Sequence, residues 1–172
     1  VDPHLHRHRS LGDIYTAPAR VAHAAPLISN WIMSEVDRPL LLGPDSESEQ
    51  WVAAVAKASG APFAVMSKIR RGDRNVEVSL PALEQWRDRT PVLVDDIAST
   101  ARTMIEGVKR LRAAHMAAPV CVAVHGIFAG DAYDSLRTAG AGRIVTLNTI
   151  PHKSNAIDVT PLLAEVVREL VT

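Results

Sequence analysis

The sequence predicts an α/β fold in which a mostly parallel sheet carries helices on both faces. The first observation is the alternation of short apolar runs with longer stretches of helical periodicity, the order expected of parallel strands joined by helices. The second is composition: 172 residues, 47% of them hydrophobic and 22% charged, suffice for one domain with a sizeable core. Aromatic residues are few, at 4%, which suits helices packed closely on a sheet.

The first expected elements alternate helix, strand and helix. Helical periodicity covers residues 21–36, and the apolar run Leu-Leu-Leu-Gly at residues 40–43 predicts the first strand. A helix over residues 46–58 follows, because Ser46 and Glu49 stand at capping-box spacing.

The middle of the chain continues the alternation with one charged interruption. Apolar residues 62–66 predict the second strand, after which residues 68–75 read as a charged loop and residues 76–79 as a short edge strand. The third main strand is expected at residues 91–94, followed by a helix over residues 103–114.

The last elements complete the expected sheet. Residues 120–124 form the fourth apolar run and residues 143–147 the fifth, with helical residues 132–139 between them. Residues 161–170 predict a terminal amphipathic helix. We detect no repeat, low-complexity segment or linker, so residues 1–172 are expected to form a single domain.

Composition also excludes several functional classes. The formal net charge is zero, so no broad field attracts nucleic acid or acidic membranes, and no run of eighteen apolar residues predicts a transmembrane helix. The single cysteine, Cys121, sits in an apolar run and is expected to be a buried strand residue, which excludes a disulfide framework. A reducing cytoplasm is the expected compartment. The opening Val-Asp-Pro-His-Leu-His, without Met, indicates part of a longer chain.

Residues 92–104 carry the strongest functional signal. An apolar run ends in two adjacent carboxylates, Asp95 and Asp96, and small or hydroxylic residues then lead into a helix. Unpaired backbone N–H groups at a helix N-terminus attract phosphate. Carboxylates repel phosphate and instead suit sugar hydroxyls or a divalent cation. The segment therefore predicts a site for a ribose 5-phosphate moiety.

Other charged groups are expected near this segment. Ligands of parallel sheets gather outside the carboxyl ends of the strands, where residues 43–45, 67–68 and 95–96 all fall. The cations of residues 68–74 are then either a solvated loop or a mobile supply of charge to a transition state. Asp45 is either a turn or helix-capping residue or a magnesium ligand.

Three histidines near the start of the chain leave three interpretations open. His4, His6 and His8 alternate and would share one face of a strand. They could bind zinc or copper, form an exposed polar segment, or place His4 beside a phosphate-and-magnesium site.

Residues 92–104 resemble the phosphoribosyl-pyrophosphate motif of type I phosphoribosyltransferases and ribose-phosphate diphosphokinases. The family pattern is an apolar run, Asp-Asp, two small or apolar residues, a hydroxylic or acidic residue, Thr, Gly, any residue and Thr. The chain departs from this pattern only at Ala101, where Gly is usual. If residue 101 needs a positive φ, Ala costs roughly 1 kcal/mol and weakens phosphate binding without removing the N–H donor.

An ordered set of motifs narrows the resemblance to the ribose-phosphate diphosphokinases, also called phosphoribosyl-pyrophosphate synthetases. Ordinary phosphoribosyltransferases share the Asp-Asp loop but generally lack the Asp-x-His and Lys-x-Arg elements. The matching segments are, in order, Asp2-Pro3-His4, Pro44-Asp45, Lys68-Ile69-Arg70, Asp95-Asp96, His125-Gly126-Ile127-Phe128 and Thr146-Leu147-Asn148-Thr149-Ile150-Pro151. The resemblance implies a phosphoribosyltransferase-like, three-layer α/β fold, here the C-terminal part of a longer two-domain enzyme.

The resemblance also implies roles for particular residues. His4 and Asp45 would lie near Mg²⁺ and the ATP triphosphate, and Lys68 and Arg70 would stabilise the transition state. Asp95 and Asp96 would hold the ribose hydroxyls. The 5-phosphate would be held by Ser99, Thr100, Ala101, Arg102 and Thr103.

The implied activity is transfer of diphosphate from ATP to ribose 5-phosphate, with magnesium as cofactor and a homo-oligomer as the full-length form. This chain alone is expected to be inactive, because much of the adenine site would lie outside it. The alternatives are a type I phosphoribosyltransferase that uses phosphoribosyl pyrophosphate and a catalytically incomplete regulatory or binding subunit.

Overall fold

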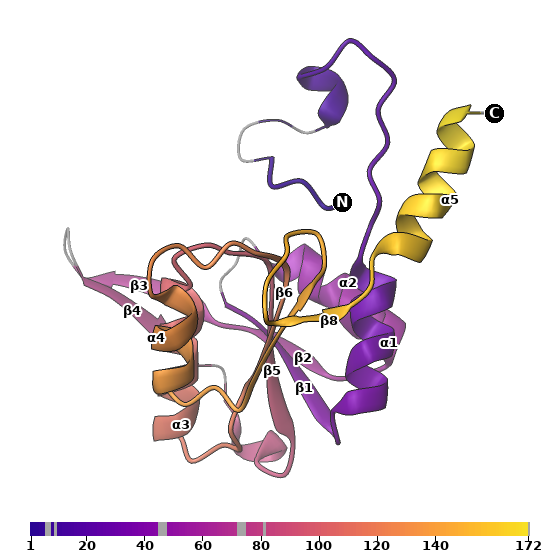
Figure 1. Ribbon diagram of the computed structural model, residues 1–172. Helices are drawn as coiled ribbons and strands as arrows, with labels where there is room; N and C mark the ends of the chain where they lie inside the picture. The colour runs from indigo at the N-terminus through magenta and orange to yellow at the C-terminus, as the bar shows by residue number, and fades with distance from the viewer. Residues whose placement is uncertain (6–7, 9, 45–47, 72–74, 81, 172) are drawn as a thin grey trace.

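The protein is a three-layer α/β domain built on one parallel sheet (Figure 1). The computed structural model describes residues 1–5, 8, 10–44, 48–71, 75–80 and 82–171, without the side chains of residues 68–71 and 75–79. Neighbouring strands of the six-stranded sheet pair in parallel, which confirms the predicted fold class. In spatial order its strands are β2 (Phe63–Val65), β1 (Pro39–Gly43), β5 (Thr90–Ala98), β6 (Val120–Gly126), β7 (Arg143–Leu147) and β8 (Asn155–Ile157).

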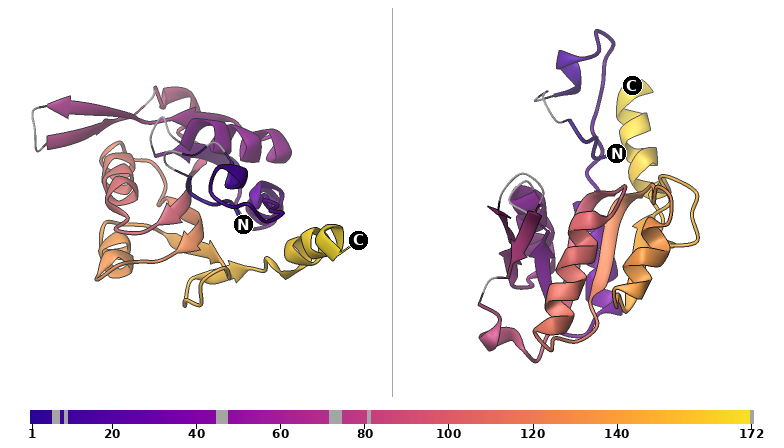
Figure 2. Two further views of the ribbon diagram at one scale, coloured as in Figure 1. Left: turned by 90° about the horizontal axis from the view of Figure 1, so that it is seen from above. Right: turned by 90° about the vertical axis from the view of Figure 1, so that its left-hand side faces the viewer.

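Alternation of side chains along the strands produces two hydrophobic cores, one on each face. On β1, Leu40 and Leu42 pack in the core that contains Met104, whereas Leu41 packs in the core that contains Ile28. Each fully buried side chain of this size contributes about 1.5–3 kcal/mol to folding. The helices of the first core are α3 (Arg102–Ala113) and α4 (Ala132–Thr138), and those of the second are α1 (Ala25–Glu35) and α2 (Glu49–Ser59) (Figure 2).

The remaining helical elements lie outside these layers. Helix α5 (Thr160–Val171) projects beyond the carboxyl edge of the sheet, on the side where the extended N-terminal segment also rises (Figure 1). Two short 3-10 helices, η1 (Leu11–Asp13) and η3 (Glu84–Trp86), lie in connections. None of the described helices combines the length and the apolar character that a bilayer crossing requires.

The prediction of a charged loop over residues 68–75 is wrong for residues 68–71 and 75, and residues 72–74 lie outside the described residues. Residues Ser67–Arg71 form strand β3, which pairs antiparallel with β4 (Asn75–Ser79) in a separate two-stranded sheet. The expected edge strand is therefore real but pairs within this hairpin. Charged residues lower strand propensity only weakly, and hairpin pairing outweighs that preference. The hairpin extends away from the body of the domain (Figure 2).

Two further differences separate the predicted elements from the observed ones. Helix α1 starts at Ala25 and not at residue 21, because Pro26 has no N–H to donate and its ring would clash with the carbonyl of residue 22, so it is tolerated only in the first turn of a helix. Strand β8 was not predicted, since Asn155–Ile157 has only three residues and no apolar run. The expected start of α2 at Ser46 lies outside the described residues, and Glu49 is its first described helical residue.

Candidate functional site

The acidic pair lies within a strand, not at its tip as the sequence suggested. β5 continues to Ala98 because β6 is equally extended there, with Asp95 opposite Ala123 and Ala98 opposite Gly126. Asp95 and Asp96 are both half-buried, and Asp95 Oδ1 accepts a hydrogen bond from the Asp96 N–H at 3.0 Å. The carboxylates therefore sit on a rigid strand end at the carboxyl edge of the sheet.

The loop after β5 turns directly into the N-terminus of α3. Ala101 is the N-cap residue, and its φ of 53° and ψ of 16° are left-handed. It is 7% exposed, and its carbonyl accepts the Ile105 N–H at 2.8 Å, closing the first helical turn. The N–H groups of the first turn of α3 have no intrahelical acceptors and point out of the helix, toward the loop. This geometry suits an anion, and it meets the positive-φ condition that we attached to Ala101.

Residues 127–129, which follow β6, bind the backbone at the start of the phosphate-loop candidate (residues 99–103). The N–H groups of Ile127 and Phe128 both donate to Ala98 O, at 3.1 and 2.9 Å, and the Ala129 N–H donates to Ser99 O at 3.0 Å. Phe128 adopts a φ of 45°, which is rare for an aromatic residue. These hydrogen bonds fix the backbone of Ala98 and Ser99 at the start of the loop.

The N-terminal segment brings His4 to the acidic pair across 92 residues of sequence. His4 Nδ1 lies 2.6 Å from Asp96 Oδ2. A carboxylate oxygen accepts, so Nδ1 carries the hydrogen and donates it. Residues 1–5 are not part of a strand, so the expectation that His4, His6 and His8 share a strand face is not met for the described residues. His6 lies outside those residues, and His8 is exposed.

Asp2 has a different role from its neighbour His4. Its side chain is 8% exposed, and Oδ2 accepts the Ala24 N–H at 2.6 Å while Oδ1 lies 3.0 Å from His23 Nδ1. The Asp2 carboxylate therefore fixes the N-terminal segment to the residue that caps α1.

The cationic residues lie on a neighbouring part of the same edge. The Met66 N–H donates to Gly43 O at 2.9 Å, so β3 begins just beyond the carboxyl ends of β1 and β2. Lys68 and Arg70 stand on β3, and their side chains lie outside the described part of the structure. Asp45 also lies outside the described residues.

The donors at this edge fit a magnesium ion that arrives with phosphate ligands. Among the described residues no three His, Cys, Asp or Glu side chains form a cluster able to hold a metal. Mg²⁺ is usually bound through one or two carboxylates, with waters and substrate phosphates completing the shell. The half-buried Asp95 and Asp96 provide carboxylate oxygens of that kind.

A cavity of about 440 Å³ opens beside Asp96, a volume within the usual range for small-molecule pockets. It lies between the N-terminal segment and α2, and its lining includes Pro3, Val21 and Trp51. The cavity was not predicted, since its lining combines residues of the N-terminal segment with Trp51 and Asp96, which only the tertiary structure brings together. Cys121 is not part of the site, because complete burial raises the pKa of its thiol to about 12 and keeps it protonated.

Comparison with known proteins gives a consistent family assignment. The model of the phosphoribosyl transferase domain matches residues 10–162. The chain is 29% identical over 169 residues to a ribose-phosphate pyrophosphokinase of Sulfurisphaera tokodaii, covering 95% of the chain and 57% of that protein. It is 29% identical over 160 residues to ribose-phosphate pyrophosphokinase 4 of Saccharomyces cerevisiae, covering 89% and 49%. The chain thus spans about half the length of the curated relatives it matches.

A solved structure shares the fold. The phosphoribosylpyrophosphate synthetase from Mycobacterium smegmatis superimposes with a TM-score of 0.70 at 23% identity, covering 86% of this chain and 50% of that one. The resemblance inferred from the ordered motifs is therefore confirmed.

Proposed function

The chain belongs to the phosphoribosyl transferase domain family, and from that premise we propose that the protein carrying it is a ribose-phosphate diphosphokinase. The enzyme would convert ATP and ribose 5-phosphate into phosphoribosyl pyrophosphate and AMP. The observation that carries this proposal is the 2.6 Å contact of His4 with Asp96. It joins the Asp-x-His segment, which the sequence resemblance associates with diphosphokinases, to the acidic pair common to the whole family.

We assign ribose 5-phosphate to the carboxyl edge of β5. The 5-phosphate accepts hydrogen bonds from the loop Ser99, Thr100, Ala101, Arg102 and Thr103, at the positive end of α3. The Asp95 and Asp96 carboxylates accept the hydrogens of the ribose hydroxyls. Strand β5 carries the acidic pair, and the backbone N–H groups of residues 127–129 hold the start of the loop. Together they would fix the distance between the carboxylates and the phosphate-binding loop.

The reaction is an in-line displacement at the β-phosphorus of ATP. The O1 hydroxyl oxygen of ribose 5-phosphate forms the new bond to phosphorus and gives up its proton, while the bond to the α-phosphate oxygen breaks and AMP leaves. Magnesium bound with ATP would neutralise part of the phosphate charge, with Asp45, His4 and the acidic pair nearest to it. His4 donates through Nδ1 to Asp96, which sets its ring orientation at the sugar end of the site.

The hairpin β3–β4 would add positively charged side chains to the site. Lys68 and Arg70 stand on β3, beyond the carboxyl ends of β1 and β2, and we assign them to the phosphate charge that develops in the transition state. A hairpin that extends from the domain can close over ATP after it binds, so these cations would act mainly in the closed form (Figure 2).

The full-length protein would supply the remaining parts. Because the curated relatives are about twice as long as this chain, we infer that residues outside it contribute most of the adenine site. The full-length form would act as a cytoplasmic homo-oligomer in nucleotide biosynthesis, with no nucleic-acid or membrane partner.

AMP formation tests the function directly. The full-length protein is incubated with magnesium, ATP and ribose 5-phosphate, and AMP and phosphoribosyl pyrophosphate are expected to appear in equal amounts. Pyrophosphate release that requires a nucleobase and phosphoribosyl pyrophosphate would identify a phosphoribosyltransferase instead. Ligand binding without either reaction would identify a regulatory or binding subunit.

A further inference from the structure

His125 connects three segments that are distant in sequence. It lies on β6 opposite Ile97 of β5, next to the acidic pair. Its ring Nδ1 lies 2.9 Å from Thr149 Oγ1, and its Nε2 lies 3.1 Å from Val1 O. The Thr149 hydroxyl in turn lies 3.0 Å from Val124 O, on the same strand as His125. Contacts at both ring nitrogens fix the orientation of the ring, with the one Thr149 hydroxyl hydrogen shared between Nδ1 and Val124 O.

The Nε2 contact holds the backbone of the N-terminal segment. Val1 O is a carbonyl and can only accept, so Nε2 carries the hydrogen. The same Nε2 lies 3.4 Å from Asp2 O, so the bond is shared between two successive carbonyls. His125 thus holds residues 1–2 from the sheet side, while the Asp2 carboxylate holds them from the α1 side through Ala24 N–H.

The segment needs such support, because its backbone is strained. Asp2 has a φ of 30°, outside the regions that L-residues favour. Conformations of this kind persist only where the surroundings determine them. Two residues further on, His4 makes its 2.6 Å bond to Asp96. The direction in which residues 1–2 run therefore decides whether His4 reaches the acidic pair.

We propose that His125 is a positioning residue, whose Nε2–H holds residues 1–2 so that His4 stays against Asp96. Its consequence for catalysis rests on the proposed function; its effect on His4 does not. The segment Ile127–Ala129, which follows on the same chain, holds the phosphate loop through Ala98 O and Ser99 O. One stretch of chain thus fixes both parts of the site, the loop and the histidine.

Two substitutions distinguish the contribution of His125 Nε2 from that of His125 Nδ1. In His125→Gln the amide nitrogen reaches approximately the place of Nε2, and in His125→Asn it reaches approximately the place of Nδ1. We expect His125→Asn to release the N-terminal segment and His125→Gln to retain it. In the 172-residue chain, NMR of the His4 ring nitrogens should show loss of the hydrogen-bonded Nδ1–H signal in the Asn variant alone. Hydrogen exchange of the Ala24 amide should accelerate about tenfold in that variant, as expected for one lost hydrogen bond.

Equal effects of the Gln and Asn variants, or an unchanged His4 signal in the Asn variant, would overturn the proposal. Thr149→Val is a second variant, should His125→Asn not fold. It frees the ring at Nδ1, and a smaller change of the same His4 signal is expected. An unchanged His4 signal in that variant would overturn the proposal equally.

A double-mutant cycle in the full-length protein tests the catalytic consequence. His125→Asn should lower the kcat of AMP formation about tenfold, matching one lost hydrogen bond, with the KM for ribose 5-phosphate nearly unchanged. In the His4→Ala background it should have no further effect, because His125 acts through His4. An equal loss in both backgrounds would show a general structural role and refute the proposal. Absence of AMP formation in the unmodified protein would instead refute the proposed function, leaving the NMR result to decide the role of His125.

Discussion

Ala101, in the phosphate-loop candidate, adopts a left-handed backbone conformation that strains an L-residue. Its φ of 53° costs an alanine roughly 1 kcal/mol, so part of the ligand-free population should relax away from the conformation that binds phosphate. Glycine has no Cβ and adopts this φ freely. We expect Ala101→Gly to tighten binding of ribose 5-phosphate or sulfate by up to about fivefold in calorimetric titration, which is this strain expressed as an equilibrium constant.

A matched control is Ala113→Gly, at the last residue of the same helix and far from the loop. It should lower stability slightly without changing affinity. If both variants bind the anion as tightly as the unmodified chain, residue 101 does not limit phosphate binding.

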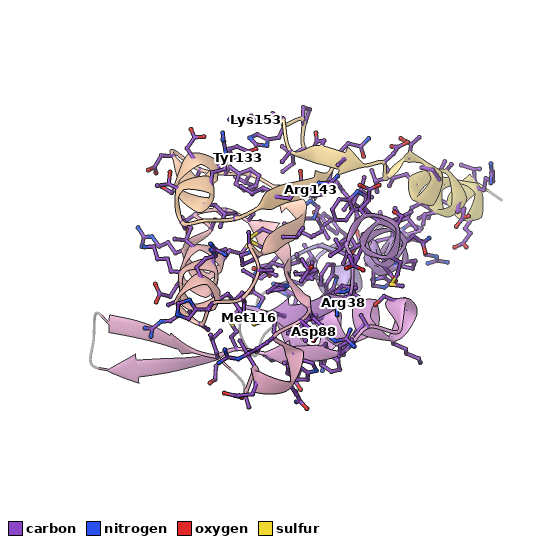
Figure 3. All side chains as sticks on the ribbon, turned by 90° about the horizontal axis from the view of Figure 1, so that it is seen from below. Arg38, Asp88, Met116, Tyr133, Arg143 and Lys153 are labelled. Atoms are coloured by element: carbon purple, nitrogen blue, oxygen red, sulfur yellow. The ribbon has the colours of Figure 1, made fainter. Side chains whose placement is uncertain are left out.

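The acidic pair offers a second test at single residues. Asp95→Asn or Asp96→Asn removes a charge-assisted acceptor for a sugar hydroxyl or a metal-bound water, so affinity for ribose 5-phosphate should fall about tenfold or more. Asp88→Asn is the control, because Asp88 pairs with Arg38 at 2.7 Å on the opposite, amino edge of the sheet (Figure 3). Unchanged titration curves in both acidic-pair variants would contradict the assignment of the ribose hydroxyls to this site.

Among the elements, the β3–β4 hairpin carries Lys68 and Arg70, the cations that we propose act on the phosphate charge of the transition state. If Lys68 acts mainly in the closed transition state, Lys68→Ala should lower kcat for AMP formation by about a hundredfold or more, and raise KM far less. Lys57→Ala, on the exposed face of α2, should leave both constants unchanged. A rise in KM at constant kcat would make Lys68 a ground-state binding residue.

Asp158 is one of the groups that join helix α5 to the body of the domain. Asp158 Oδ1 accepts hydrogen bonds from Thr160 Oγ1 at 2.7 Å, Thr160 N–H at 3.0 Å and Asn148 Nδ2 at 2.8 Å. The side-chain hydrogen bond from Thr160 is the largest cause that lowers the pKa of Asp158, followed by the Thr160 backbone and Asn148. The contribution of Asp158 to stability is therefore complete above the usual value of 3.8 and is lost as pH falls through the lowered value.

Asp158→Ala should accordingly lower the melting temperature at pH 7 but not at a pH below the lowered pKa, where the unmodified protein has lost the same bonds. Asp37→Ala, an exposed carboxylate near the amino edge, serves as control and should change little at either pH. A deficit of the Asp158 variant that persists in acid would mean that side-chain packing, and not charge, fastens α5.

How well the sequence predicts a strand depends on the length of its apolar run. Strands β1, β5, β6 and β7 follow from apolar runs, since their largely buried side chains leave little ambiguity. The three-residue β8 and the charged β3 lack such runs, and only their pairing partners define them. The functional loop was recognisable because its pattern is local. The contact of His4 with Asp96, the strained φ of Phe128 and the link from His125 to Val1 depend on tertiary structure, which no local pattern encodes.

At the scale of the whole molecule, the site candidates gather at one edge. The N-terminal segment, the phosphate-loop candidate, the base of the hairpin and the start of α5 all lie toward the carboxyl ends of the strands (Figure 1). On the proposed assignment, the anchors for ribose and its phosphate all lie within residues 95–103, so we expect sugar binding not to depend on the rest of a longer protein. Nucleotide binding is expected to differ, because the curated relatives are about twice as long as this chain and we assign most of the adenine site to residues outside it.

We therefore expect the 172-residue chain to bind ribose 5-phosphate but to show negligible AMP formation. Without the binding energy of the adenine end, the triphosphate is neither held nor aligned with the attacking hydroxyl, and alignment alone can contribute about 7–11 kcal/mol to lowering a barrier. The measurement compares AMP formation by this chain and by the full-length protein, with calorimetric binding of ribose 5-phosphate to both as the control for folding. We expect both proteins to bind ribose 5-phosphate with equal affinity and only the full-length protein to form AMP. Turnover by the 172-residue chain in the usual enzyme range of roughly 1–1000 per second would place the nucleotide site within residues 1–172. It would refute the proposal that most of the adenine site lies outside this chain.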